Sequence, residues 1–208
     1  AILTDGGSKQ PDTLHFDGTP DDNAIGLTAG GTYQAAARFT PTELGPYAGW
    51  EIQTVIFYHH EAMSHSGRAI VYDQGTPSLP GDTLSQEPYT APAAGWITIP
   101  LSSPVAIGGA TDIWTSIEIT HSAGQYPISV DAGPAVAGKG DWVYATGLPW
   151  DELRDLGFDV NWDIRAIVAP GVAPWLDANP RNGSVAAGDT FQVTVSFNSA
   201  GLAPGLYT

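Results

Sequence analysis

Hydrophobic and polar residues alternate with a period of two in many short segments of the chain. The clearest segment is residues 112–121, DIWTSIEITH. One of its faces carries Ile113, Thr115, Ile117 and Ile119, and the other carries Trp114, Ser116, Glu118 and Thr120. Further strand-like runs occupy residues 35–39, 51–58, 69–72, 95–101, 128–130, 141–144 and 162–168. Such runs, separated by Gly, Pro, Asn and Asp, predict an all-β fold built as an antiparallel β-sandwich.

One segment has the features of a short helix. Residues 149–156, PWDELRDL, begin with proline and carry acidic side chains in the first turn, and Gly157 follows them. Proline and acids favour the start of a helix, and glycine favours its end. We therefore expect one helix of about two turns there.

The stretch APGVAP at residues 169–174 separates two parts of the chain. Two prolines and a glycine between strand-like segments indicate a short, stiff linker. We therefore predict a β-sandwich over residues 1–170 and a second segment over residues 171–208. An immunoglobulin-like sandwich needs about seven strands, so 34 to 38 residues predict an incomplete module.

The second segment resembles a bacterial Ig-like module. The residues that carry the resemblance are Trp175-Leu176, Asn179-Pro180, Gly183-Ser184-Val185, Gly188-Asp189-Thr190, Val193-Thr194-Val195 and the closing sequence GLAPGLYT at residues 201–208. In that family a further strand follows the Tyr-Thr pair. The resemblance therefore implies a partial, truncated Ig-like β segment.

The first 170 residues resemble the jelly-roll adhesin modules of bacterial secreted and cell-surface proteins, of the cleaved-adhesin kind. The matching motifs, in order, are FDG at residues 16–18, NAIG at 23–26, AARFTP at 36–41, YAGW at 47–50, VIFY at 55–58, VY at 71–72, PG at 80–81 and DIW at 112–114. The resemblance implies a non-catalytic jelly-roll sandwich, often stabilised by Ca²⁺. It also implies an extracellular or cell-surface location and a role in attachment or targeting.

Composition excludes several classes of protein. The chain has 22 acidic and 7 basic residues, a formal net charge of −15, which argues against nucleic-acid binding because that needs a basic face. The absence of cysteine excludes disulfides, thiol nucleophiles and thiolate metal sites. No apolar run approaches the 18 residues of a membrane span.

The acidity is mostly aspartate and is densest in one predicted loop. The sequence FDGTPDDN places Asp17, Asp21, Asp22 and Asn23 close together. Calcium binds six to eight oxygen ligands, so we predict a Ca²⁺ site in this loop. Asp131 and Asp163 are candidate oxygen donors from distant strands. The alternative is that these residues cap turns on a solvated loop.

Histidines offer a second, competing metal site. His59 and His60 lie next to each other in a predicted strand and therefore point to opposite faces. His60, Glu61 and His65 could converge across a short loop and hold Zn²⁺ or Cu²⁺. The alternative is a polar strand edge without a metal.

Catalytic signatures are weak. The chain has no G-x-S-x-G nucleophile elbow, and no carboxylate pair stands out as a glycosidase pair. We therefore expect no enzymatic activity. The face with Trp114, Ser116, Glu118 and Thr120 combines an aromatic side chain with polar ones, which suits ligand binding, although a half-solvated sheet has the same pattern.

Together these features predict a non-catalytic, calcium-stabilised adhesion or targeting module that binds a glycan or a surface protein. One alternative is a carbohydrate-binding module of an extracellular enzyme. Another is a fibre subunit that self-associates through an unpaired strand edge, with the apolar residues 1–4 as the donor strand.

Overall fold

A computed structural model describes residues 10–171, 176–179, 188, 190 and 192–197. Contacts between Cα atoms divide the chain into two units, Ala1–Pro170 and Gly171–Thr208. Each unit is described by itself.

The first sheet of the larger unit contains six antiparallel strands in the order β1-β12-β4-β9-β2, with β7 paired to β4. These strands are β1 (Asp12–His15), β2 (Pro20–Ile25), β4 (Trp50–His59), β7 (Gly95–Ala106), β9 (Ile128–Asp131) and β12 (Ile164–Pro170).

The second sheet has the order β11-β10-β3-β8-β5-β6, and its neighbouring strands are also antiparallel. Its strands are β3 (Gly30–Phe39), β5 (His65–Tyr72), β6 (Thr83–Ala91), β8 (Ile113–Ser122), β10 (Trp142–Ala145) and β11 (Asp151–Glu152). At its centre, β3 and β8 pair without interruption from Gly30↔Ser122 to Phe39↔Ile113.

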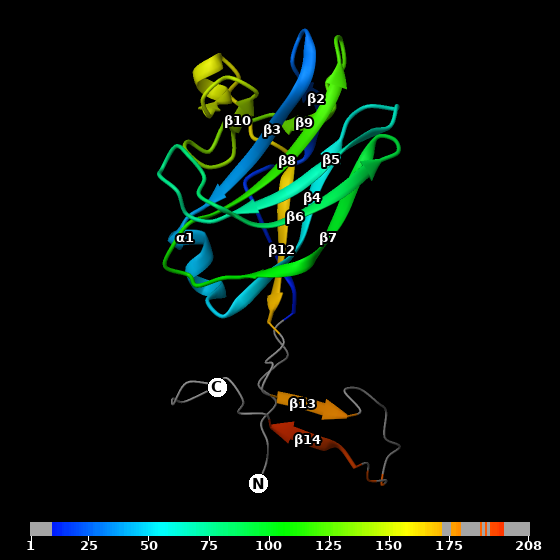
Figure 1. Cartoon of the computed structure of the whole chain (residues 1–208), viewed down its shortest axis with the longest axis vertical. Helices are drawn as coiled ribbons and strands as arrows, with labels where there is room; N and C mark the ends of the chain where they lie inside the picture. The colour runs from blue at the N-terminus through cyan, green and yellow to red at the C-terminus, as the bar shows by residue number, and fades with distance from the viewer. Residues whose placement is uncertain (1–9, 172–175, 180–187, 189, 191, 198–208) are drawn as a thin grey trace. The chain divides into compact units, whose positions relative to one another are not determined.

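The two sheets pack against each other through apolar side chains (Figure 1). Phe39 and Ile117 of the second sheet lie in one buried cluster with Val55, Phe57 and Ile164 of the first. Burial of such side chains contributes about 1.5–3 kcal/mol each. The predicted all-β antiparallel sandwich is therefore confirmed.

Helical structure is found at a different place from the predicted one. The α-helix α1 (Pro41–Leu44) is followed by the 3-10 helix η1 (Gly45–Tyr47). In the predicted helical segment, strand β11 comes first and only the 3-10 helix η2 (Leu153–Leu156) is helical. Pairing of Glu152 with Trp142 outweighs the helical tendency of the segment, and Gly157 then ends η2 in a left-handed conformation (φ 95°).

In the smaller unit, strands β13 (Leu176–Asn179) and β14 (Thr194–Phe197) form an antiparallel pair. Most of the residues behind the Ig-like resemblance lie outside the described residues, and so does the suggested donor strand at residues 1–4. No helix among the described residues is long and apolar enough to cross a membrane.

Candidate functional site

Cross-strand register builds a polar outer face on the second sheet. On β8, Ile117 and Ile119 point into the core, so Glu118 points outward. Gln34 of β3 and Arg68 of β5 both pair with Glu118, one on each side. We call the surface formed by these outward-pointing side chains of β3, β8 and β5 the outer face.

A cavity of about 640 Å³ lies on one end of this outer face, and we call it the aromatic cavity. Two loops border it: one connects β5 to β6, and the other connects β10 to β11. Its lining consists of Gln34, Tyr72, Ser78, Leu79, Pro80, Gly81, Tyr144, Leu148, Pro149 and Trp150. Its volume falls within the range of small-molecule binding sites.

Aromatic rings form one wall of the aromatic cavity. Tyr144 and Trp150 stack with their centroids 5.4 Å apart and their planes at 28°. Trp150 also meets the edge of Trp114, with the centroids 6.0 Å apart. Because Trp114 is fully buried beneath them, the stack rests on a packed base.

The floor of the aromatic cavity is a connected hydrogen-bond network. The Gln34 side-chain oxygen accepts hydrogen bonds from the Tyr72 hydroxyl (2.8 Å) and the Ser116 hydroxyl (3.1 Å). The Gln34 amide nitrogen donates to Glu118 (3.3 Å), which also accepts from the Arg68 Nε atom (3.0 Å). These bonds fix the orientation of the polar side chains before a ligand arrives.

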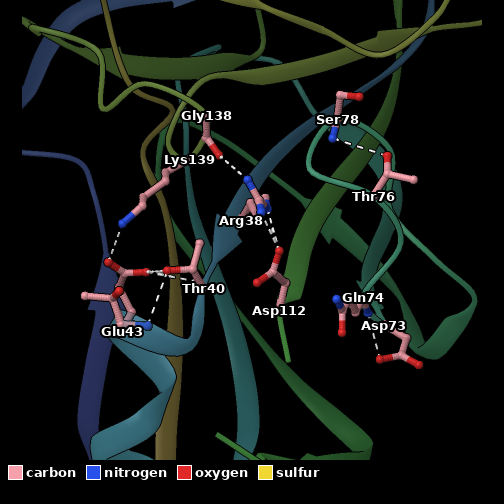
Figure 2. Close-up of polar contacts among 11 residues, drawn as sticks. Arg38, Thr40, Glu43, Asp73, Gln74, Thr76, Ser78, Asp112, Gly138 and Lys139 are labelled. Carbon is pink, nitrogen blue, oxygen red and sulfur yellow. Dashed lines mark hydrogen bonds and ion pairs between the residues drawn. The ribbon is translucent and has the colours of Figure 1, made fainter. Parts of the chain in front are cut away.

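Charged contacts hold the surroundings of this site in place (Figure 2). The Arg38 guanidinium donates to Asp112 (2.7 Å) and to the main-chain oxygen of Gly138 (3.3 Å), and it lies 5.8 Å from the centre of the Trp114 ring. In the bordering loop, the Asp73 carboxylate accepts from the main-chain nitrogen of Gln74 (2.7 Å). Arg38 thus braces the sheet beside the site, and the Asp73 bond joins two neighbouring residues at the start of the loop.

The four residues predicted to bind ligand do lie on one face, but they are not equally accessible. Trp114 and Ser116 are fully buried under the neighbouring side chains, Glu118 is half-buried, and Thr120 is exposed. Trp114 therefore supports the aromatic wall instead of offering a free ring. Whether these residues bind a ligand stays a prediction.

The aromatic cavity also contains residues that the sequence patterns did not identify, which are Gln34, Tyr72 and Tyr144. Gln34, Tyr72, Tyr144 and Trp150 come from four different segments of the chain. Tyr72 and Tyr144 each sit at or near the end of a strand-like run, which is the signal that could have suggested them. The pairing of Gln34 with Tyr144 across β3 and β10, and the hydrogen bond from Tyr72 to Gln34, bring three of these segments together.

The structure places three of the predicted calcium ligands in the interior. Asp17, Asp131 and Asp163 are all buried, and the charges of Asp17 and Asp131 both act on Asp163. Asp17 accepts two bonds from Arg165, from Nε at 2.9 Å and from Nη2 at 2.6 Å. Asp131 accepts from the main chain of Asn161 (2.7 Å) and from its side chain (3.0 Å).

Asp163 differs from its neighbours because neither carboxylate oxygen has a hydrogen-bond partner among the described residues. The Ser129 hydroxyl has a lowering effect on the pKa of Asp163. Its proton, however, is donated to the main-chain oxygen of Asn23 (3.1 Å). Burial is the main cause that raises the pKa of Asp163 to about 7, and the charges of Asp17 and Asp131 add to it. A buried carboxylate without partners is costly unless a proton or a cation neutralises it.

The other predicted calcium ligands lie on a strand and not on a free loop. Asp21, Asp22 and Asn23 belong to β2, where the register with β9 shifts between Pro20 and Asn23. All three side chains are exposed, and Asp22 has a positive φ of 55°. Within the described ranges, no three His, Cys, Asp or Glu side chains form a group that could hold a metal ion. The calcium site remains a prediction.

Among the histidines, the structure pairs His59 with His65. His59 is fully buried, and its Nε2 atom lies 2.9 Å from Nδ1 of His65. The Nε2 atom of His65 lies 3.0 Å from the Gln125 side-chain oxygen. The convergence of His60, Glu61 and His65 that we considered from the sequence is therefore replaced by a direct contact between His59 and His65.

Comparison with known proteins identifies similar folds but no family. No protein-family model matches the chain, and no curated protein matches it. One similar structure contains the cysteine protease and lectin-like domains of Cwp84, a surface-layer associated protein of Clostridium difficile. It is 12% identical with a TM-score of 0.50, and the match covers 68% of this chain and 33% of that one.

A second similar structure is clostridial Cwp84 after propeptide cleavage. It is 11% identical with a TM-score of 0.57, and the match covers 77% of this chain and 40% of that one. The chain therefore spans two fifths or less of the length of these proteins. At this level of identity the likeness concerns the fold.

Proposed function

We propose that the larger unit is a non-catalytic glycan-binding module of a bacterial cell-surface protein, and that it serves adhesion or the targeting of attached domains. The observation that carries this proposal is the aromatic cavity, where the stacked Tyr144 and Trp150 stand beside the ordered polar side chains of Gln34 and Tyr72. Aromatic faces pack against the apolar faces of sugars, and fixed polar groups select their hydroxyls.

The similar structures support the same proposal. They come from a bacterial surface-layer protein that joins a cysteine protease to a lectin-like domain. A unit made of two antiparallel sheets is what we expect to match the lectin-like part of such a protein. This likeness supports our proposal of a binding module at the bacterial cell surface.

The chemistry of the site favours binding over catalysis. Hydrolysis of a glycosidic bond needs two carboxylates across the bond that is cut. The described lining of the aromatic cavity contains no Asp or Glu. Glu118, an acid of the outer face, is bound to Arg68 and Gln34.

Calcium stabilisation is part of this proposal. Both oxygens of Asp163 and the Oδ1 atom of Asp17 are buried without a hydrogen bond among the described residues, although the Nδ1 atom of His15 lies 3.2 Å from Asp17 Oδ1. Oxygen atoms of this kind suit Ca²⁺, so Asp163 and Asp17 would hold the ion. Asp131, which already accepts bonds from Asn161, Gly18 and Gly133, would brace the surrounding backbone.

The test is retention of the protein on insoluble cellulose, xylan, chitin and bacterial cell walls. Trp150→Ala should abolish retention, because it removes half of the aromatic stack. Trp96→Ala is the matched control, because Trp96 is a partly exposed tryptophan of β7 in the first sheet. Equal retention of both variants, or none of the wild type on any of these materials, would overturn the proposal.

A further inference from the structure

The second sheet opens into a fork at the end of the outer face away from the aromatic cavity. Strands β5 and β8 pair from Tyr72↔Trp114 only as far as Gly67↔Ile119. Beyond that point, β5 continues in its pairing with β6 and β8 continues in its pairing with β3. Figure 1 shows the ends of these two strand pairs diverging.

A second cavity, of about 430 Å³, lies in this fork, and we call it the fork cavity. Residues 64–66 of one branch and residues 120–122 of the other line it, together with Gln125. It is therefore framed by the strand ends themselves and not by long loops.

Hydroxyl groups with unused hydrogen-bonding capacity line the fork cavity. Thr120 shares one hydrogen bond with Thr32 (2.7 Å), and Ser66 shares one with Thr90 (3.1 Å). Each pair has two hydroxyl protons for one bond, so one donor per pair is available to a ligand. The hydroxyls of Ser64 and Ser122 make no hydrogen bond within the described part of the chain.

The fork cavity and the aromatic cavity belong to the same outer face. Thr120, which lines the fork cavity, lies six residues from Trp114, which supports the aromatic wall. At the rise of an extended strand this separation is about 20 Å. Between the two ends lies the hydrogen-bonded row of Gln34, Glu118 and Arg68. A ligand that used both cavities would follow β8 along its length.

Charge restricts the chemistry of such a ligand. Arg68 is the cation at the middle of this path, and its guanidinium lies 2.6 Å from Glu118, which neutralises it. The chain as a whole carries a net charge of −15. Sulfated or uronic acid sugars would therefore be repelled, whereas uncharged sugars would not.

We propose that the fork cavity is a second subsite of the glycan-binding face, and that the ligand is an uncharged, unbranched sugar chain lying along β8 from the aromatic cavity to the fork cavity. This inference rests on the proposed function. It predicts that affinity grows with chain length, because short sugars reach the aromatic cavity alone.

Titration calorimetry with β-1,4-linked glucose, xylose and mannose oligosaccharides of two to six units tests this inference. The double variant Ser66→Ala, Thr120→Val removes the two spare donors and should weaken binding of the hexasaccharide about 10-fold. Binding of the disaccharide should not change. Thr98→Val is the control, because Thr98 is an exposed threonine of β7 in the other sheet.

The outcomes separate the two proposals. Loss of all binding in Trp150→Ala, together with equal affinities for two and six units, would overturn the fork subsite and leave the proposed function standing. Unchanged hexasaccharide binding in the double variant would do the same. Tighter binding of a polyuronate than of the uncharged chains would overturn the assignment of ligand class. Absence of binding by the wild type to every sugar would overturn both proposals.

Discussion

The Nε2 atom of buried His59 lies 2.9 Å from the Nδ1 atom of His65, at the inner side of the fork cavity. The two outer ring nitrogens meet acceptors: Nδ1 of His59 lies 2.9 Å from the main-chain oxygen of Ala93, and Nε2 of His65 lies 3.0 Å from the Gln125 oxygen. The Gln125 orientation is fixed because the same oxygen accepts from the main-chain nitrogen of Ser122 (2.8 Å).

The main-chain oxygen of Ala93 can only accept a hydrogen bond, so Nδ1 of His59 carries a proton and donates it there. Burial is the main cause that lowers the pKa of His59; the charges of His65 and His60 lower it further, while Glu61 and the bond to Ala93 oppose this. His59 is therefore neutral, with its single ring proton on Nδ1. Nitrogen-15 NMR of the rings at pH 7 should show a protonated Nδ1 and an unprotonated Nε2 in His59. A proton on Nε2 of His59 at that pH would contradict this account.

Asp163 should make stability depend on pH and on calcium. Its pKa rises from 3.8 to about 7 in the folded protein, so between these values the folded state holds a proton that the unfolded state has lost. The free energy of unfolding therefore falls as the pH rises toward 7. Above pH 7 the folded protein bears the full cost of burying the ionised Asp163 carboxylate. At pH 8 with a chelator, Asp163→Asn should melt roughly 5 °C or more above the wild type.

Millimolar calcium at pH 8 should raise the melting temperature of the wild type and leave that of Asp163→Asn nearly unchanged, because binding to the native state alone stabilises it. Differential scanning calorimetry with and without the ion measures both effects. An equal calcium response in the two proteins would show that Asp163 does not hold the ion.

Asp141 is a control for Asp163, because its carboxylate is also buried but we do not expect it to bind calcium. Burial is the main cause that raises its pKa from 3.8 to about 6, and its Oδ1 atom has no hydrogen bond among the described residues. As for Asp163, burying the ionised carboxylate lowers the stability of the protein. Asp141→Asn should therefore stabilise the protein above pH 6 and have little effect at pH 4. Its response to calcium should equal that of the wild type. If Asp141→Asn lost the response to calcium, the ion would be bound at Asp141, which would contradict our proposal.

Gly67 is the residue at which the fork begins, and it should not tolerate a side chain. A Cβ atom there would lie 1.9 Å from the main-chain oxygen of Glu118 and 2.8 Å from the Tyr89 hydroxyl. Gly67→Ala should therefore lower the free energy of unfolding by about 1–3 kcal/mol in urea denaturation. Gly45→Ala is the control, because Gly45 has φ −54° and no atom near the added carbon. Equal stabilities of the two variants would contradict the close approach of β5 to β8.

Sequence alternation predicted the strands whose inward faces build the core, such as β8, because burial of one face imposes a period of two. It did not identify β6, which contains Pro88, and proline argues against a strand unless the strand lies at an edge, as β6 does. The helix α1 was also missed, although Thr40 and Glu43 form a capping box that signals its start.

The candidate site was only partly predictable. The polarity of Glu118 and Thr120 marked an outward face, because residues two apart on a strand share a side. The positions of Tyr144, Trp150 and Gln34 depend on which strands become neighbours, and a single sequence does not specify that pairing. In the same way, the burial of Trp114 follows from the loop that carries Trp150 over it.

A structure of the protein crystallised with a hexasaccharide that it retains tests the central claim most directly. We predict an intact sugar chain with one ring packed on the Tyr144 and Trp150 wall, its hydroxyls bonded near Gln34 and Tyr72, and its far end in the fork cavity. A sugar bound on the first sheet, or a chain found cleaved, would contradict the account of this unit as a non-catalytic glycan-binding module.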